Sequence, residues 1–270
     1  AFELGQRMGL PYTNHYTPVE VFLNGVYQGS YLLTEQMQVG KGRVDIDEDE
    51  GFFVELDKHY DEEPKFRTDL YNLPVMIKSP EDLDDPSGYD FVKTAINGLE
   101  AAMEADTFPE SGYRDLINMD TFVDFLLINE IVHNNELWYP KSTYMYKDKG
   151  DAKISMGPLW DFDWAFGYTG SGHAYFNSPN SRSVKNAFFQ RFFEDSVFTA
   201  QYKAHWNAKY VDIARMPAFI DEQAEKLRKS QAENFKIWWT GDTIDYFNEI
   251  EKMKTWWTAR VAYLNTEINK

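Results

Sequence analysis

Residues 142–167 read STYMYKDKGDAKISMGPLWDFDWAFG. The segment 142–147 predicts a strand, 153–157 begins another, and the DKGD between them predicts a hairpin turn. Asp161 and Asp163 follow, and two carboxylates two residues apart on a strand would point to the same face. Large aromatic residues flank both, and charged groups are rarely packed among aromatics unless something satisfies them. This stretch therefore predicts a hairpin that leads into a site for a cation, or for a phosphate that carries one.

The residues just upstream supply a second set of polar groups. Asp120 is a good N-cap for an apolar helix at 121–133, and Asn134, Asn135 and Glu136 follow it. The resulting order is helix, polar loop, hairpin and acidic segment. Phosphoryl-transfer enzymes of the protein-kinase type use this order, with a carboxylate near the acceptor hydroxyl and a second aspartate on a metal. Order alone also fits a buried structural loop, so both interpretations remain open here.

The part of the chain before residue 80 is rich in predicted strands. Asn24-Gly25 lies between two runs of β-branched and aromatic residues, which is the strongest short signal for a β-hairpin. Gly29, inside the second run, predicts a bulge or a close approach of another segment. The predicted strands are residues 19–23, 26–33, 51–57 and 75–78, with a helix at 2–9 that stops at Gly9, a solvated acidic loop at 45–50 and a polar loop at 58–69.

The part after residue 80 is mainly helical. From Ser87 onward, apolar residues such as Phe91 and Leu99 recur with a helical period. Residues 168–182 are predicted to form a loop and residues 184–270 to be helical. Strands followed by helices, without a repeat or a linker, predict one α+β domain over 1–270.

Composition excludes several classes of protein. The chain carries 44 acidic and 27 basic residues, a net charge of −17. This charge repels phosphate backbones, so nucleic acid is excluded as a partner, although a nucleotide can still bind through a metal. The lack of cysteine excludes a disulfide framework and cysteine-based metal or redox sites. The sequence contains no apolar run of about 18 residues, so no membrane span is predicted, and no signal peptide is visible.

Several motifs in order resemble the CotH kinase family, the secretory kinases similar to spore-coat protein H. Residues 24–35, NGVYQGSYLLTE, resemble its N-G-x-Y-x-G-x-Y-x-L-x-E stretch. Residues 134–136, 142–148 and 157–163 resemble its catalytic half, and 257–264 its C-terminal helix. The resemblance covers roughly residues 1 to 264, and the variant looks most like forms from gut Bacteroidetes.

The resemblance implies an atypical protein-kinase-like fold that binds ATP and Mg²⁺ and phosphorylates serine or threonine of a protein partner. It also implies an extracytoplasmic or cell-surface location, and it leaves the oligomeric state open. The residues that it assigns are Asp161 as metal ligand with Asp163 beside it, Glu136 and Asn135 in the catalytic loop, Trp160 stacked on adenine, Glu55, Leu56 and Asp57 near the base, and Glu35 in the nucleotide lobe.

The chain departs from the family pattern in two ways. Glu136 stands where active members have aspartate, and a displacement of about 1 Å can cost on the order of 100-fold in rate. The R-G-x-S and K-K-x-Y stretches that begin family members, with a phosphate-binding lysine, are absent. We therefore expect a domain without its N-terminal strands, in which 1–80 is the remnant of the nucleotide lobe and 81–270 the catalytic lobe.

Two alternatives to an active kinase follow from these departures. One is a pseudokinase that has kept the fold. The other is a non-catalytic cell-surface or coat-assembly module that binds polysaccharide, for which an exposed Trp238-Trp239 or Trp256-Trp257 pair would offer a stacking surface.

Overall fold

The computed structural model describes residues 1–81, 89–170, 172, 174–238 and 244–270. Its mixture of helices and strands confirms the predicted α+β class. The elements in chain order are α1 (Phe2–Met8), β1 (Tyr16–Leu23), β2 (Val26–Thr34), β3 (Phe52–Leu56), β4 (Lys65–Arg67), β5 (Pro74–Ser79), α2 (Asp90–Glu104), η2 (Tyr113–Asp115), α3 (Met119–Ile131), η3 (Asn135–Leu137), β6 (Thr143–Lys147), β7 (Ser155–Met156), α4 (Ala187–Arg191), η4 (Phe192–Glu194), α5 (Ser196–Ala214), α6 (Met216–Trp238) and α7 (Tyr246–Ile268).

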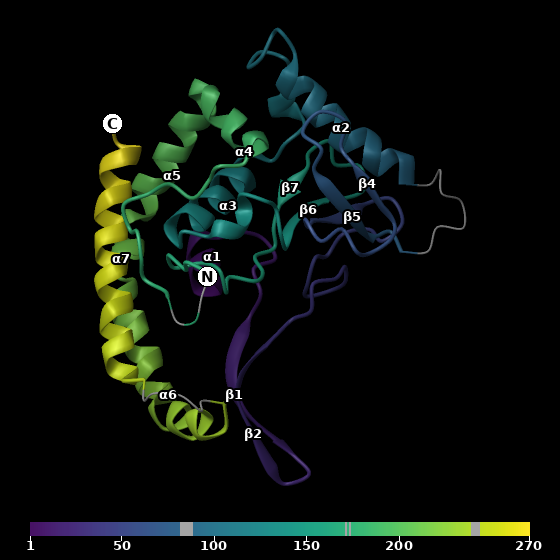
Figure 1. Cartoon of the computed structure of the whole chain (residues 1–270). Helices are drawn as coiled ribbons and strands as arrows, with labels where there is room; N and C mark the ends of the chain where they lie inside the picture. Colours follow the sequence, from purple (N-terminus) through teal and green to yellow (C-terminus); the bar gives the residue numbers. More distant parts are fainter. Residues whose placement is uncertain (82–88, 171, 173, 239–243) are drawn as a thin grey trace.

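The hairpin β1–β2 projects from the rest of the molecule, with α6 packed along it (Figure 1). Asn24 and Gly25 both have positive φ, as the tight turn of a hairpin requires. Gly29 lies opposite a register shift in β1, so the predicted bulge is confirmed. The close approach is also real, because a Cβ on Gly29 would lie 2.5 Å from Nε1 of Trp238. Gly29 therefore joins the hairpin to α6.

A second sheet has five antiparallel strands in the order β4-β5-β3-β6-β7. Every residue of the central strand β3 is buried, as predicted for 51–57. The edge strand β4 lies in the expected polar loop 58–69 and was not predicted, because its exposed sequence lacks an apolar pattern. Since β3 to β5 precede residue 80 and β6 and β7 follow it, this sheet crosses the expected lobe boundary.

Helix α3 runs through the core and is followed by residues 134–136, which the family resemblance assigns to a catalytic loop. Its residues 121–131 are all buried, and α5 and α7 pack against it. The predicted N-cap is wrong by two positions, because Asn118 caps the helix and Asp120 lies in the first turn. Helix α3 therefore contacts α1, strand β7 of the five-stranded sheet, and the C-terminal helices α5 and α7.

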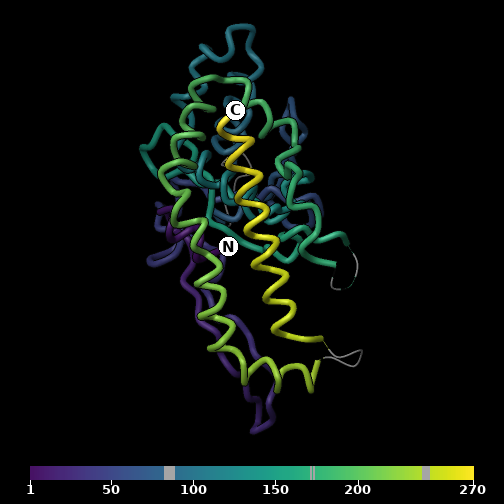
Figure 2. The backbone as a smooth tube through the Cα atoms, turned by 90° about the vertical axis from the view of Figure 1, so that its left-hand side faces the viewer, coloured from purple at the N-terminus to yellow at the C-terminus, as the bar shows by residue number. Residues whose placement is uncertain are grey.

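The C-terminal helices form one side of the molecule, where α7 runs beside α5 and α6 (Figure 2). Trp256 and Trp257 are buried in the core, so this pair offers no stacking surface. Trp238 is exposed, and its predicted neighbour Trp239 lies outside the described residues. The described helices include none with the length and apolarity needed to cross a bilayer.

Two further predictions concern irregular regions. Helix α2 begins at Asp90, and the expected start near Ser87 lies outside the described residues. Phe91 departs from the buried stripe of this helix and is exposed. Among the described residues of 168–182 there is neither helix nor strand, as predicted for a loop.

Candidate active site

Three carboxylates converge at the end of α3. One oxygen each from Glu136, Asp161 and Asp163 lies within 4.8 Å of the other two. Glu136 is in η3, which is separated from the end of α3 by three residues, and the two aspartates follow β7. The structure therefore brings together the residues that the sequence assigned to catalysis and to the metal.

The path of the chain through the two aspartates differs from the expected strand. Residues 157–163 form no strand, and Asp161 has a φ of 55°, in the left-handed region. Aspartate tolerates this conformation better than most residues because its short side chain can bond locally. A turn follows, in which Ala165 N donates to Phe162 O at 3.2 Å. The prediction of a shared strand face was wrong, but the two carboxyl groups still converge through the turn.

Lys141 links Glu136 to Asp161, and the sequence did not predict this. Its Nζ lies 2.8 Å from Oε1 of Glu136 and 3.8 Å from Oδ2 of Asp161. A lone lysine carries no sequence pattern and is usually a solvated surface residue. The available signal was its place five residues after Glu136 and directly before the predicted strand 142–147.

Ser142 connects the site to the central strand of the sheet. Its Oγ lies 3.4 Å from Oδ2 of Asp161, and its backbone N donates to Oδ2 of Asp57 at 3.3 Å. Asp57 directly follows β3, and the adjoining Lys58 N donates to Pro140 O at 2.9 Å. The end of β3 therefore lies against the 140–142 segment of the site.

The electrostatics of the site leave it short of positive charge. Burial raises the pKa of Glu136, while the hydrogen bond and charge of Lys141 act in the opposite direction. Burial and the neighbouring Asp161 raise the pKa of Asp163. In turn, the hydrogen bond to Glu136 raises the pKa of Lys141. One ammonium therefore faces three carboxyl groups.

The donor set fits a divalent cation. Oε2 of Glu136 is buried and has no hydrogen-bond partner among the described residues, although a buried carboxylate oxygen is costly to leave unpaired. Carboxylate oxygens are the ligands that Mg²⁺ prefers. A cation held by Asp161 and Asp163 would reduce the repulsion among the three groups and could accept the unpaired oxygen.

The loop that carries Glu136 is held by two asparagines. Asn134 Oδ1 accepts from Glu136 N at 3.1 Å, and Asn134 Nδ2 donates to Asn129 Oδ1 at 3.0 Å. Asn135 Nδ2 donates to Tyr168 O at 3.0 Å. Asn134 therefore caps η3, and Asn135 ties the loop to the segment that follows the two aspartates.

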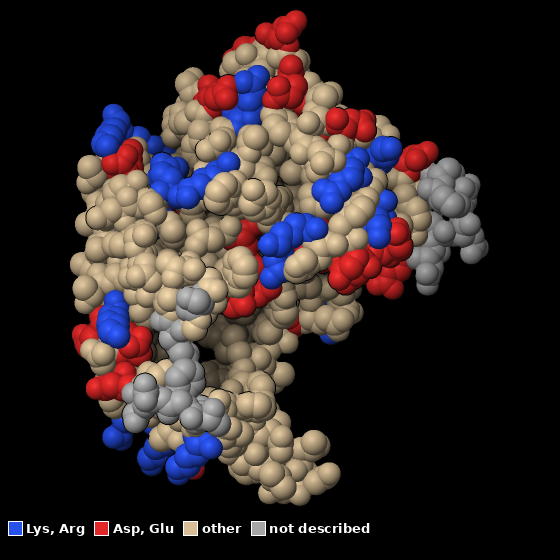
Figure 3. Space-filling view, viewed as in Figure 1, with Lys and Arg blue, Asp and Glu red and all other residues tan. Residues whose placement is uncertain are grey.

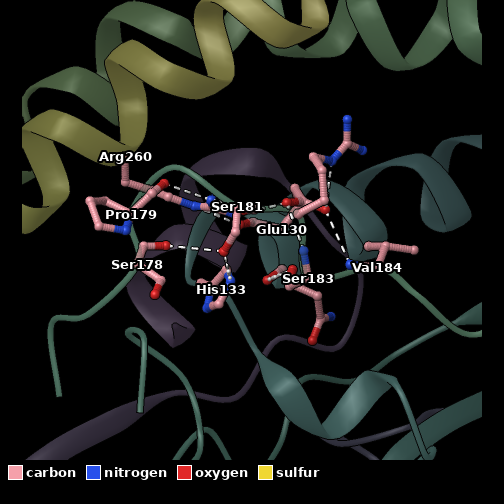
Figure 4. A network of polar contacts seen from close by, with 10 residues as sticks. Glu130, His133, Ser178, Pro179, Ser181, Ser183, Val184 and Arg260 are labelled. Atoms are coloured by element: carbon pink, nitrogen blue, oxygen red, sulfur yellow. Dashed lines mark hydrogen bonds and ion pairs between the residues drawn. The ribbon is translucent and has the colours of Figure 1, made fainter. Parts of the chain in front are cut away.

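A buried ionic network holds the end of α3, from which the loop with Glu136 departs. Arg260 of α7 donates from Nη2 to Oε1 of Glu130 at 2.7 Å and from Nε to Glu130 O at 3.1 Å. Figure 4 shows Arg260 extending toward Glu130, with Pro179 and Ser181 near Arg260 and Val184 on the other side of Glu130. Ser183 N and Val184 N also donate to the Glu130 carboxylate, at 3.1 and 3.2 Å. The last turn of α3 is thereby fixed to α7.

His133 lies between Glu130 and Glu136 in the sequence. Its Nε2 is 2.8 Å from Oγ of Ser181, and its Nδ1 is buried without a partner among the residues described. Burial lowers its pKa to about 4, so the ring is neutral at pH 7. This placement is typical of a packing histidine rather than a base.

The residues assigned to nucleotide binding are spread over a wider region. The ring of Trp160 lies 6.3 Å from that of Phe2 and packs with Tyr144 and its neighbours. Glu35 follows β2 and pairs with His15, whose Nδ1 is 2.8 Å from Oε1. A pocket of about 270 Å³ lies beside Glu35 and Tyr12, and Oε2 of Glu35 is buried with no hydrogen-bond partner in the described chain.

Glu55 and Leu56 lie inside the five-stranded sheet. Leu56 is fully buried, and β3 is paired on both sides, with β5 and β6. Glu55 is 3.6 Å from Nζ of Lys78, and burial raises its pKa. Of the 55–57 segment, only Asp57 lies beside the acidic site, so base contact by Glu55 and Leu56 stays a prediction.

A cleft of about 360 Å³ opens beside the acidic site. Glu136, Asn135 and Lys141 lie on one wall, and Trp164 and Tyr168 lie on another. Nζ of Lys141 is 5.7 Å from the centre of the Trp164 ring. The cleft gives a second molecule access to the Glu136 side of the site.

Two comparisons with known proteins bear on this arrangement. A family model described as CotH kinase protein matches residues 1–264. A search of curated proteins finds no match to the chain. The family match spans almost all of the 270 residues and includes every site residue described above.

Proposed function

The chain belongs to the CotH kinase family, and on this premise we propose that it transfers the γ-phosphoryl group of ATP, with Mg²⁺, to a serine or threonine of a protein partner. Family membership itself suggests kinase-like phosphotransfer. The observation that carries the finer proposal is the convergence of Glu136, Asp161 and Asp163 within 4.8 Å, beside an open cleft.

Glu136 is the proposed general base. Its carboxylate accepts the proton of the acceptor hydroxyl as the hydroxyl oxygen forms a bond to the γ-phosphorus. The bond between that phosphorus and the β–γ bridging oxygen breaks, and ADP leaves. The raised pKa of Glu136 suits this role, because a base is most effective when its pKa lies close to the working pH.

Lys141 and Ser142 position the other groups in this proposal. The ammonium of Lys141, 2.8 Å from Glu136, favours the ionised carboxylate and so opposes the effect of burial on its pKa. Ser142 holds the side chain of Asp161 from the other side. Asp161 and Asp163 would hold Mg²⁺, which when bound neutralises charge on the phosphates.

We further propose that the nucleotide approaches from the side of the β1–β2 hairpin. Trp160 and Glu35 lie toward that side, and the pocket at Glu35 has an unpaired buried carboxylate oxygen able to accept from an exocyclic amino group. In this arrangement residues 1–270 form one kinase-like domain. The family also suggests an extracytoplasmic role, and we propose a cell-surface location.

Calorimetric titration with Mg·ATP tests the site. We expect binding by the 270-residue chain and loss of at least about tenfold in affinity for Asp161→Asn, since one charged ligand is removed. Asparagine tolerates the positive φ at this position, so the variant isolates the charge. Asp212→Asn, at an exposed position on α5, is the matched control and should bind as the wild type does.

Two results would contradict the proposal. Equal affinity of the wild type and Asp161→Asn would remove the metal role of Asp161. No binding of Mg·ATP by the wild type would instead favour the non-catalytic module.

A further inference from the structure

The cleft beside Glu136 continues into a second one. A cleft of about 460 Å³ shares Lys58, Trp138, Tyr139 and Lys185 with the first and extends to Arg67 of β4. We call the two together the basic groove. It therefore runs from the acidic site to the edge of the five-stranded sheet.

Three basic side chains of the groove have no carboxylate partner among the described residues. Lys58, Arg67 and Lys185 are exposed, and in the described part of the chain none forms an ion pair with a carboxylate. This is unexpected in a chain with 44 acidic residues, where a nearby carboxylate is easily supplied. Figure 3 shows lysine and arginine side chains close to acidic ones near the middle of this face.

The cations of the groove rest on aromatic rings. Nζ of Lys58 lies 5.4 Å from the centre of the Trp164 ring, and Nζ of Lys185 lies 5.4 Å from that of Trp138. Arg67 lies 4.6 Å from the ring centre of Tyr60. These contacts hold the cations in place without removing their charge. They therefore remain free to pair with an anion.

Trp138 and Tyr139 form an exposed wall of the same groove. Their rings stack at 5.3 Å, and the two side chains are 49% and 61% exposed. Large exposed aromatics beside basic side chains are typical of the centre of a binding surface. The wall offers apolar area against which a peptide backbone can pack.

We propose that the basic groove binds an acidic segment of the protein acceptor, with aspartate or glutamate side chains against Lys58 and Lys185. The segment would lead its serine or threonine hydroxyl to Glu136, which lines the same groove. This inference rests on the proposed kinase function. Charge complementarity selects an acidic ligand, and the open connection to Glu136 favours the phosphoryl acceptor over a separate anionic polysaccharide.

The first experiment measures binding without nucleotide. A fluorescent serine peptide rich in glutamate is titrated with the 270-residue chain by anisotropy, beside glutamine-rich and lysine-rich peptides of the same length. We expect the glutamate-rich peptide to bind best and to lose about tenfold or more in affinity to Lys58→Glu/Lys185→Glu. Lys153→Glu, an exposed lysine on the β6–β7 hairpin, is the control and should leave the affinity unchanged.

Three outcomes would overturn the inference. They are equal binding of the three peptides, equal loss of affinity in Lys153→Glu, and binding of polygalacturonate, lost in Lys58→Glu/Lys185→Glu, by a chain that does not bind the acidic peptide. The last outcome would make the groove a polysaccharide site.

The second experiment separates the groove from the chemistry. With radiolabelled ATP, the charge-reversed variant should raise KM for the acidic peptide about tenfold while kcat stays within about twofold, because the groove holds the acceptor and not the reacting atoms. Binding of the acidic peptide without transfer to it would support the groove and contradict the kinase function. Transfer to basic peptides with equal or lower KM would leave the kinase function standing and overturn the groove.

Discussion

Glu130 and Glu136 lie six residues apart at the end of α3, and both are buried, yet their surroundings differ. The Glu130 carboxylate has ion pairs with Arg260 and Arg182 and accepts two backbone N–H bonds. Glu136 has one ammonium partner, and one of its oxygens has none among the described residues. The carboxylate of Glu130 therefore has a full set of ion-pair and hydrogen-bond partners, whereas that of Glu136 does not.

On the proposed function, this difference separates a structural carboxylate from a functional one. A buried carboxylate costs free energy unless it is paired and hydrogen-bonded, so the complete set around Glu130 belongs to the fold. The incomplete set around Glu136 leaves room for a ligand of the opposite sign. The two positions are also linked, because Arg260 fixes the helix end from which the loop with Glu136 departs.

The largest expected effect is on phosphoryl transfer. Glu136→Ala should lower the rate by about 100- to 10,000-fold, the usual contribution of a general base. Glu136→Asp should raise the rate, because active family members have aspartate there. Radiolabelled transfer to a protein or peptide acceptor measures both, with Glu225→Ala on the exposed face of α6 as control. Full activity of Glu136→Ala would remove this residue from the mechanism.

The second-largest expected effect is the loss of stability when the Glu130–Arg260 ion pair is broken. Arg260→Ala leaves Glu130 buried with an incomplete set of partners, and we expect a loss of about 3 to 5 kcal/mol in the free energy of unfolding. Urea unfolding followed by circular dichroism measures the loss. Lys252→Ala, an exposed ion pair on the same helix, should cost less than about 1 kcal/mol. Similar losses in both variants would contradict a structural role specific to Glu130 and Arg260.

The buried His133 predicts that the stability of the fold depends on pH. Burial lowers the folded-state pKa of His133 to about 4, so acidification protonates the unfolded state first. Its contribution to stability is present above the ordinary histidine pKa and is lost as the pH falls toward 4, by up to about 3 kcal/mol. His133→Gln should therefore lose less stability than the wild type between pH 7 and 4. Parallel stability curves over this range would rule out the effect.

The smallest expected effect is a gain in stability at the incomplete site. Burial raises the pKa of Glu136, so its ionisation at neutral pH opposes folding, and this cost appears as the pH rises above the ordinary glutamate pKa. Glu136→Gln should therefore raise Tm by about 2 °C at pH 7, and by less near pH 4. Differential scanning calorimetry at both pH values measures the change. A lower Tm at pH 7 would mean that the Lys141 ion pair fully compensates the burial.

Local sequence patterns were sufficient for most elements near the site. Asn24-Gly25 fixed the β1–β2 hairpin, and the apolar run after Asp120 predicted α3. The hairpin β6–β7 was also recognised, since its turn residues are typical. These elements depend on neighbours in the sequence, so periodicity and turn chemistry are enough to find them.

The parts that the sequence did not predict depend on contacts between distant segments. Arg260 and Glu130 are 130 residues apart, and no local pattern marks them as a pair. Lys141 has no distinguishing neighbours, although it joins Glu136 to Asp161. The turn at Asp161 was read as a strand because alternating aromatic and acidic residues match the period of a strand.

The backbone at Asp161 has a consequence for how related sequences can diverge. Its φ of 55° is a conformation that glycine, asparagine and aspartate adopt with the least strain. Selection for folding alone would accept any of these three at this position, whereas selection for metal binding would accept only the carboxylate. A related sequence that has glycine or asparagine at 161 but keeps Glu130 and Arg260 would therefore have lost the proposed metal ligand and kept the ion pair that stabilises the fold.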